Sequence, residues 1–250
     1  MSQKIIVVGS GNLTTEIYET SILLGFDILI LDLLNNSPLT GVNTLNPLEI
    51  TNELRKLPII MGAVNYPENA KFSFLDLTRK NREKLYADIQ NLGFKNWTSI
   101  IHPSAVVSAS AKIGKNVFIG ANSTVSTNCV ISNNTRINRN VSIGHDVTVG
   151  TFCDISPGAV ITGAAVLENS VFIGAGAVLI NGLRVGEGAS VAAGSVVTRS
   201  VDRCALVMGS PARTKNQLTR KIRKRIFPYA SAILKALKLH TFFKRLTRRY

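Results

Sequence analysis

The chain is poor in cysteine and histidine, and it has no long apolar run. Its 250 residues include three cysteines and three histidines. No stretch is long and apolar enough to span a membrane, and the segment at residues 1–9, with a single lysine, lacks the design of a signal peptide. A low number of cysteines is typical of proteins in a reducing compartment, so we expect a cytoplasmic protein.

Acidic residues are absent from the last 48 positions. All fifteen Asp and Glu residues lie at or before Asp202, and the same stretch carries fifteen Lys and Arg, so residues 1–202 are neutral overall. The fourteen Lys and Arg after that point account for the net charge of +14. The basic character therefore belongs to a tail and not to the body of the protein.

From residue 101 onward the chain follows a strict repeat of six residues. Neither an α-helix nor a flat strand has this period, whereas a parallel β-helix with three short strands per coil does. We predict a rod of stacked coils that pair in parallel about 4.8 Å apart. The repeated position, which would point inward, is aliphatic seventeen times without an insertion: Ile101, Val107, Ile113, Ile119, Val125, Ile131, Ile137, Ile143, Val149, Ile155, Ile161, Leu167, Ile173, Leu179, Val185, Val191 and Val197.

The neighbouring slots of the repeat support this fold. Two residues before the aliphatic position the side chain is mostly small, which suits a tight inward corner, and Cys129 and Cys153 occupy this slot as expected core residues. Three residues after it, eleven of the seventeen positions hold Asn, Asp or Gly, which tolerate the positive φ that a tight corner requires. A short rod has open edges, so the segments before residue 98 and after residue 205 are the expected caps.

The first 98 residues are predicted to form a small α/β domain. Residues 4–9 would form a buried strand, residues 14–24 a helix, and residues 26–31 a second strand with Asp32 at its tip. A further strand is expected at residues 58–62 and a further helix at residues 79–92. This order favours a parallel sheet with helices packed on it.

The glycine turn at residues 9–12 has two interpretations. Backbone N–H groups at the start of a helix can bind a phosphate, and this turn with Asp32 would line a sugar or nucleotide-sugar pocket at the C-terminal edge of the sheet. A dinucleotide fingerprint would need a third glycine where the chain has Thr14, and the segment is too short for a full dinucleotide-binding domain. The turn is equally consistent with a junction whose glycines serve geometry alone.

His145 has the setting expected of a catalytic group. His102 lies where the first coil begins, and His240 lies in the basic tail. His145 occupies an exposed corner slot in the middle of the rod, beside Gly144, where an imidazole could remove a proton from an amine or a hydroxyl. Asp146 could orient the imidazole and raise its basicity. An ordinary surface histidine and a corner aspartate explain the same two residues.

We expect neither a metal centre nor a covalent intermediate on a cysteine. A zinc site on a β-helix needs about three histidines within reach, and the middle of the rod offers one. A cysteine relay would need exterior thiols at the corners, whereas Cys129 and Cys153 occupy the inward slot. His145 therefore remains the candidate for the chemistry.

Four segments together resemble one family, the bacterial sugar O/N-acyltransferases that include sialic acid O-acetyltransferase and the UDP-4-amino-sugar acetyltransferases. The resemblance covers roughly residues 3–213. It implies a left-handed β-helix behind a Rossmann-like domain, and a homotrimer with active sites between neighbouring subunits. The segments are residues 4–12 with Asp32, residues 101–108 (Ile-His-Pro-Ser-Ala-Val-Val-Ser), residues 141–158 around Gly-His-Asp, and residues 207–213 (Val-Met-Gly-Ser-Pro-Ala-Arg).

The resemblance also implies an activity and roles for individual residues. The activity would be acetyl-CoA-dependent O- or N-acetylation of a sugar or nucleotide-sugar in bacterial surface-glycan biosynthesis, by direct transfer and without a metal. The implied general base is His145, supported by Asp146; the implied acetyl-CoA contacts are Asp154, Ala175 and Ala193; the implied acceptor contacts are Ser10, Gly11, Asn12, Asp32 and Gly62.

These features divide the chain into a Rossmann-like acceptor-binding domain at residues 1–98, a β-helix at residues 99–205, and a cap with a basic amphipathic tail at residues 206–250. Residues 214–250 are predicted to be helical and could lie on an anionic membrane, at its inner face. Packing against the open end of the rod is an equal alternative, and nucleic acid is disfavoured because few aromatic side chains accompany the charge. A competing hypothesis is a catalytically inactive trimeric scaffold that binds a sugar nucleotide or a membrane.

Overall fold

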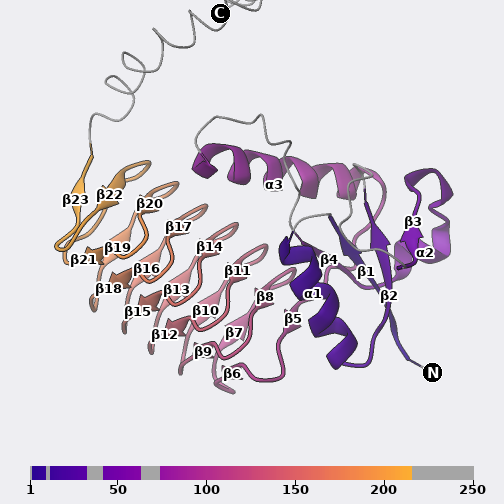
Figure 1. The fold of residues 1–250 in the computed structure, drawn as a ribbon, viewed down its shortest axis with the longest axis horizontal. Coiled ribbons are helices and arrows are strands. Elements are labelled where there is room, and N and C mark those ends of the chain that lie inside the picture. The colour runs from indigo at the N-terminus through magenta and orange to yellow at the C-terminus, as the bar shows by residue number, and fades with distance from the viewer. Residues whose placement is uncertain (1, 10–11, 33–41, 63–73, 216–250) are drawn as a thin grey trace, which may run out of the picture. The chain divides into compact units, whose positions relative to one another are not determined.

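A computed structural model describes residues 2–9, 12–32, 42–62 and 74–215 of the chain. A small sheet with helices comes first, and a rod of stacked coils follows it (Figure 1). The division at residues 98 and 205 stays a prediction, because residues Met1–Thr214 form a single compact unit.

The N-terminal sheet has four parallel strands in the order β3-β2-β1-β4. Its βαβ unit follows from alternating buried strands and a helix, as the sequence predicts. The strands are β1 (Lys4–Val8), β2 (Asp27–Leu31), β3 (Thr44–Leu45) and β4 (Ile59–Met61), and the helices are α1 (Asn12–Leu23), the 3-10 turn η1 (Pro47–Glu49), α2 (Asn52–Lys56) and α3 (Phe74–Asn91).

The two helices predicted from the sequence differ from the prediction in extent, and the short elements β3, η1 and α2 lie where none was expected. Helix α1 begins at residue 12 and not 14, and α3 begins at residue 74 and not 79. Strand β3 and helix α2 had no counterpart in the prediction. They span two and five residues, which is too short for periodicity to show. Helix α2 depends on a local cap, in which the Thr51 hydroxyl accepts a hydrogen bond from the Leu54 N–H at 3.3 Å.

The rod has three faces, each a sheet extended by one parallel strand per coil, and β23 alone is added antiparallel at the end of one face. We number them in chain order. Face 1 contains β5 (Ile100–Ile101), β8 (Phe118–Ile119), β11 (Arg136–Ile137), β14 (Asp154–Ile155), β17 (Phe172–Ile173), β20 (Ser190–Val191), β22 (Leu206–Met208) and β23 (Arg213–Thr214). Face 2 contains β6 (Val106–Val107), β9 (Thr124–Val125), β12 (Ser142–Ile143), β15 (Val160–Ile161), β18 (Val178–Leu179) and β21 (Val196–Val197). Face 3 contains β7 (Lys112–Ile113), β10 (Val130–Ile131), β13 (Thr148–Val149), β16 (Val166–Leu167) and β19 (Arg184–Val185).

The register of the rod confirms the six-residue repeat. Each strand pairs with the strand one coil further on, as Ile143 does with Ile161, and both side chains are at most 1% exposed. The small inward slot is also buried, and its hydroxyls are satisfied: Ser123 donates to the Asn138 carbonyl at 2.7 Å and Thr135 to the Gly150 carbonyl at 2.8 Å. The core of the rod is therefore a continuous cluster of buried side chains whose inward hydroxyls are paired.

The corners turn through residues with positive φ. We call them the 1–2, 2–3 and 3–1 corners after the faces that they join. All eleven Asn, Asp and Gly residues predicted to hold this conformation do so, and Phe152, Ala164 and Ser170 adopt it as well. Residues other than Gly, Asn and Asp adopt this conformation at a cost.

The two ends of the rod are covered differently. At the first coil, Ile100 and Phe118 belong to one hydrophobic cluster with Ile5 and Ile17 of the N-terminal sheet and α1. At the last coil, β22 pairs with β20, and β23 pairs antiparallel with β22. None of the helices in the described ranges has the length and apolarity needed to cross a bilayer.

Candidate active site

His145 and Asp146 lie together on the 2–3 corner, between β12 and β13. The Nδ1 atom of His145 lies 2.8 Å from Oδ2 of Asp146. Both side chains are more than half exposed, at 59% and 52%. Among the described residues, none forms a hydrogen bond with Nε2 of His145. The imidazole therefore has one nitrogen held by Asp146 and one without a hydrogen-bond partner among the described residues.

Two neighbouring coils hold this pair in place. On the preceding coil, Nδ2 of Asn128 donates to the second carboxylate oxygen, Oδ1 of Asp146, at 3.1 Å. On the following coil, the His145 ring lies against Gly163, where an added Cβ would come 2.5 Å from Nε2. Glycine at position 163 therefore provides the space that the ring occupies, and Asn128 fixes the carboxylate that orients it.

The electrostatics of the pair favour a charged carboxylate. The hydrogen bond from His145, followed by that from Asn128, holds the pKa of Asp146 below its ordinary value. An ionised carboxylate can only accept hydrogen bonds, so Nδ1 of His145 carries the proton of this contact. The lone pair of the neutral ring then resides on Nε2, which is the arrangement a general base needs.

The residues implied in acetyl-CoA binding do not lie on the same corner as His145. Ala175 follows β17 and Ala193 follows β20, so both lie on the 1–2 corner, one coil apart and exposed. Face 2 separates this corner from the 2–3 corner. Within one chain the fold brings Ala175 and Ala193 together, and it does not bring them to His145.

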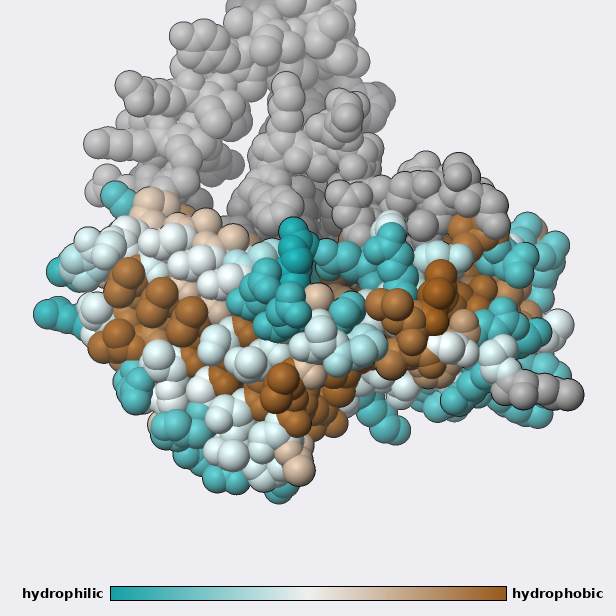
Figure 2. All heavy atoms as spheres, turned by 60° about the horizontal axis from the view of Figure 1, so that its bottom comes forward, coloured by the Kyte–Doolittle hydropathy of each residue, from teal (hydrophilic) through white to brown (hydrophobic). Residues whose placement is uncertain are grey.

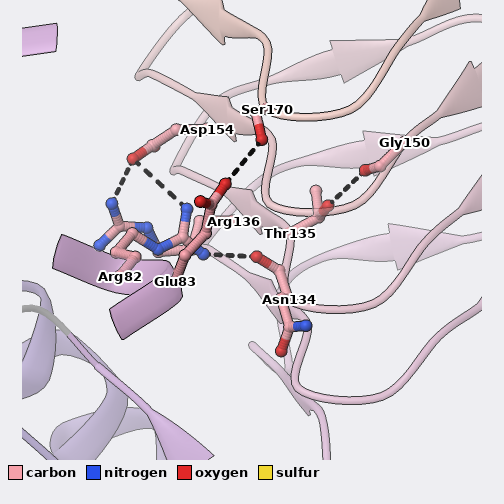
Figure 3. A network of polar contacts seen from close by, with 8 residues as sticks. All are labelled: Arg82, Glu83, Asn134, Thr135, Arg136, Gly150, Asp154 and Ser170. Atoms are coloured by element: carbon pink, nitrogen blue, oxygen red, sulfur yellow. Dashed lines mark hydrogen bonds and ion pairs between the residues drawn. The ribbon is translucent and has the colours of Figure 1, made fainter. Parts of the chain in front are cut away.

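Asp154, the third implied acetyl-CoA contact, lies on face 1 in a cluster of charges (Figure 3). Its Oδ2 accepts a hydrogen bond from Arg136 and lies 4.0 Å from Nη1 of Arg82 in α3. Arg82 also donates to the Asn134 carbonyl. The adjacent Glu83 accepts a hydrogen bond from the Ser170 hydroxyl of the rod at 3.1 Å. Burial, followed by the nearby Arg136, lowers the pKa of Arg82 to about 9. Asp154 therefore helps to fasten α3 to the rod.

Asp32 and Gly62, two of the residues implied in acceptor binding, lie at one edge of the N-terminal sheet. Asp32 directly follows β2 and Gly62 directly follows β4, and the ends of these strands flank the end of β1, where Val8 pairs with Leu31 and with Met61. Asp32 is buried, and an added Cβ at Gly62 would come 2.5 Å from Oγ1 of Thr14.

Of the turn at residues 9–12, the structure describes Gly9 and Asn12. Asn12 is the first residue of α1, whereas Ser10 and Gly11 lie outside the described residues.

The thiols and possible metal ligands of the described residues are scattered. Cys129 and Cys153 are buried, as predicted, and Cys204 is exposed near the last coil. Burial raises the pKa of the Cys153 thiol to about 12 and also raises that of Cys129. Within the part of the chain that the structure describes, no three His, Cys, Asp or Glu side chains are grouped so that they could hold a metal ion.

Asn128 and Gly163 are site residues that the sequence analysis did not select. Each lies 18 residues from a member of the pair, Asn128 before Asp146 and Gly163 after His145. This is the spacing at which residues of adjacent coils are neighbours, as the strand register shows. Reading one coil up and one coil down from His145 would have found both.

Comparison with known families matches the rod. The family described as "Bacterial transferase hexapeptide (six repeats)" matches residues 128–163 and 164–199. The family described as "Hexapeptide repeat of succinyl-transferase" matches residues 111–139. Among curated proteins, the chain is 42% identical over 71 residues to 2,3,4,5-tetrahydropyridine-2,6-dicarboxylate N-acetyltransferase of Staphylococcus aureus (strain JH9), over 25% of this chain and 30% of that protein. The chain thus spans less than a third of the length of this relative.

Solved structures match both the rod and the N-terminal sheet. PerB from Caulobacter crescentus, in complex with CoA and GDP-perosamine, is 25% identical with a TM-score of 0.70, over 85% of this chain and 97% of that chain. The acetyltransferase domain of PglB from Neisseria gonorrhoeae FA1090, in complex with acetyl coenzyme A, is 25% identical with a TM-score of 0.72, over 86% of this chain and 100% of that chain. WeeI from Acinetobacter baumannii AYE, at 22% identity and a TM-score of 0.69, shares the fold over 85% of this chain and 100% of that chain.

These matches confirm the predicted architecture for the described residues, a Rossmann-like domain followed by a left-handed β-helix. The predicted helical tail lies outside the described residues. The repeat families and the two 25%-identical structures point to one group of proteins. The rod of the chain therefore carries the bacterial transferase hexapeptide repeat, and the chain is similar to bacterial sugar acyltransferases of the left-handed β-helix type.

Proposed function

We propose that the protein transfers an acetyl group from acetyl-CoA to a hydroxyl or amino group of a sugar or nucleotide-sugar. The observation that carries this proposal is the exposed pair on the 2–3 corner, in which Asp146 holds Nδ1 of His145 at 2.8 Å and leaves Nε2 free of described partners. The solved structures that contain CoA with GDP-perosamine, or acetyl coenzyme A, support the choice of substrates.

His145 would act as the general base and Asp146 would orient it. Nε2 takes the proton from the acceptor O–H or N–H as that oxygen or nitrogen bonds to the thioester carbonyl carbon. Asp146 stabilises the imidazolium that forms, and backbone N–H groups near the corner stabilise the oxyanion. The carbon–sulfur bond then breaks, and the imidazolium returns the proton to the departing CoA sulfur. Every proton and electron pair is accounted for without a covalent enzyme intermediate.

The cysteines favour this direct route. The reactive form of cysteine is the thiolate, and burial raises the pKa of Cys153 to about 12 and disfavours the thiolate of Cys129 as well. Cys204 is exposed but lies beyond β21, after the last complete coil. None of the three therefore suits an acyl relay at the His145 corner.

The active site would be completed by a neighbouring subunit of a homotrimer. In one chain, Ala175 and Ala193 lie on the 1–2 corner and His145 lies on the 2–3 corner, so acetyl-CoA bound along the former reaches the base of an adjacent rod. Asp154 would contribute to the same groove from face 1. Valine side chains on the outside of faces 2 and 3 offer apolar surface for such packing, with Val106 67%, Val130 37% and Val166 39% exposed. Figure 2 shows apolar patches divided by polar surface on the side of the molecule that is lowest in Figure 1.

The acceptor would bind at the strand ends of the N-terminal domain. The turn at Ser10, Gly11 and Asn12 would offer backbone N–H groups to a phosphate or sugar, and Asp32 and Gly62 would line the same edge. With such a substrate, the reaction would belong to bacterial surface-glycan biosynthesis.

The basic tail would bring the enzyme to an anionic membrane. Residues 215–250 contain twelve Lys and Arg and no acidic residue, and each basic residue near an anionic surface contributes about 1 kcal/mol of attraction. Flotation with phosphatidylglycerol vesicles checks this for the full chain and for a chain truncated after Lys215. Equal flotation of the two forms would remove the membrane role.

Calorimetric titration with acetyl-CoA, followed by a thiol-release assay with a panel of nucleotide sugars, tests the function. We expect saturable acetyl-CoA binding by both the wild type and His145→Ala, and thiol release by the wild type alone. Binding without thiol release for every acceptor would favour the trimeric scaffold instead. Absence of acetyl-CoA binding would contradict the proposed acetyltransferase activity.

A further inference from the structure

Two asparagines on the 3–1 corner differ from the other corner asparagines in being buried. Asn116 and Asn134 are 4% and 5% exposed, whereas Asn122, Asn128 and Asn140 are exposed. All five have positive φ, so the corner conformation is the same in each. Burial of a primary amide requires hydrogen-bond partners, and the partners of Asn116 and Asn134 link the rod to the N-terminal domain.

Asn116 connects the rod to the end of β4. Its Oδ1 accepts a hydrogen bond from the Met61 N–H at 2.8 Å, and its Nδ2 donates to Oδ1 of Asn134 at 2.7 Å. The Asn134 carbonyl in turn accepts from Arg82 of α3 (Figure 3). The two side-chain amides thus join β4 to adjacent coils of the rod, and the backbone carbonyl of Asn134 joins α3 to them.

The bond to Met61 controls the position of a predicted acceptor residue. Met61 is the last residue of β4, and Gly62 follows it. Gly62 donates to the Val8 carbonyl at 2.8 Å and packs against Thr14 so closely that no side chain fits. The end of β4 is therefore fixed on one side by β1 and α1 and on the other side by the Asn116 amide.

We propose that Asn116 is a positioning residue for the acceptor sugar, a role that rests on the proposed acetyl transfer. The acceptor edge belongs to the N-terminal sheet, whereas the base and the acetyl-CoA contacts belong to the rod. Their relative position decides whether the attacking atom meets the thioester, and a displacement of about 1 Å can reduce a rate by about a hundredfold. Asn116 sets that position from the rod side, and Asn134 holds the Asn116 amide in place.

The matched substitutions are Asn116→Gly and Asn122→Gly. Glycine keeps the positive φ at both corners and removes only the amide. At position 116 it leaves the buried Met61 N–H without its acceptor, while the Asn122 side chain forms no hydrogen bond in the described ranges.

Thiol release is measured with acetyl-CoA and the acceptor varied separately. For Asn116→Gly we expect the acceptor KM to rise about tenfold, which corresponds to the loss of one buried hydrogen bond. The acetyl-CoA KM should stay within about twofold, because its proposed contacts are carried by the rod alone. Asn122→Gly should match the wild type in both constants.

Asn134→Gly provides a second test if Asn116→Gly does not fold. It removes the side-chain oxygen to which Nδ2 of Asn116 donates, and it leaves the backbone carbonyl for Arg82. We therefore expect the KM for the acceptor sugar to rise about threefold.

The possible outcomes separate this inference from the proposed function. An acceptor KM unchanged in both variants, with an active wild type, overturns the positioning role alone. An equal rise of the two KM values, together with a lower melting temperature, shows a general structural role and also overturns it. A wild type without thiol release for any acceptor refutes the proposed function and this role with it.

Discussion

The 2–3 corner and the 3–1 corner of the rod use the same backbone turn for different purposes. On the 2–3 corner the positive-φ slot holds Asp146, which is exposed and orients His145. On the 3–1 corner it holds Asn116 and Asn134, which are buried against the N-terminal domain. The turn geometry is common to both, so the difference comes from what covers each corner. Side chains on the exposed corner are available for chemistry. Side chains on the corner that the N-terminal domain covers instead form hydrogen bonds that hold this domain on the rod.

Removing the imidazole of the exposed corner should have the largest effect. We expect His145→Ala to lower kcat by about 10²- to 10⁴-fold, the usual contribution of a general base, with little loss of stability because the side chain is 59% exposed. Thiol release at saturating acetyl-CoA measures the effect. His102→Ala, at the first coil, is the control and should retain wild-type kcat. A similar loss in both variants would end the distinction between His145 and an ordinary surface histidine.

Breaking the charge cluster beside the covered corner should have the next largest effect. Asp154→Ala leaves Arg82 and Arg136 without their shared carboxylate, and both are at least 92% buried. We expect the free energy of unfolding to fall by about 3 kcal/mol, measured by urea denaturation of the full chain.

The exposed pair between Lys56 and Glu53 gives the control for this cluster. Lys56→Ala should cost less than about 1 kcal/mol. Equal urea midpoints for Asp154→Ala and Lys56→Ala would show that the cluster is no anchor. The acetyl-CoA KM of Asp154→Ala shows separately whether this residue also contacts the cofactor.

A side chain at position 163, beside the imidazole, should lower activity without disturbing the buried core of the rod. An added Cβ at Gly163 would lie 2.5 Å from Nε2 of His145, so Gly163→Ala must displace the ring. We expect kcat/KM to fall roughly tenfold or more, because the base leaves its position. The control is Thr127→Ala. Thr127 lies on the same corner two coils before Gly163, and this substitution should leave kcat/KM unchanged. Unchanged kinetics for Gly163→Ala would mean that the ring acts from another position.

The smallest expected effect concerns the carboxylate of the exposed corner. Asn128→Gly keeps the positive φ and removes the 3.1 Å hydrogen bond to Asp146. The pKa of Asp146, which His145 and then Asn128 hold below its ordinary value, should move upward. A lowered carboxylate pKa gives stability that is present above the unfolded pKa and is lost as pH falls through the folded pKa. On acidification, the variant should therefore lose the stability that ionised Asp146 provides at a higher pH than the wild type does.

An NMR titration of the carboxyl carbon measures the shift, and Asn122→Gly is the control. We expect kcat/KM to fall about twofold to threefold, as for one exposed hydrogen bond. An unchanged Asp146 titration would show that Asn128 does not support the carboxylate.

The rod could be predicted from sequence because its contacts repeat. Ile143 meets Ile161 for the same reason that Ile137 meets Ile155, so one spacing determines the core, the corners and the exposed slot of His145. Asn128 and Gly163 follow from the same spacing once the coil length is known.

The N-terminal domain could be predicted only in outline. Helix α2 depends on one side-chain cap at Thr51, and its five residues leave no periodic signal. The meeting of Arg82 with Asp154, and of Met61 with Asn116, depends on how the domain packs on the rod. Such contacts join residues far apart in the chain and have no spacing that a sequence could display.

The central claim is that His145 of one subunit acts on acetyl-CoA held by the 1–2 corner of another. Co-expression of His145→Ala and Ala175→Trp chains with two different tags, followed by purification on both tags, isolates mixed oligomers. The account predicts that these recover about one third of wild-type thiol release, because one of three interfaces in a mixed trimer pairs an intact base with an intact groove. Each variant alone should be inactive. Mixed oligomers as inactive as the single variants, beside an active wild type carrying the same tags, would contradict the account.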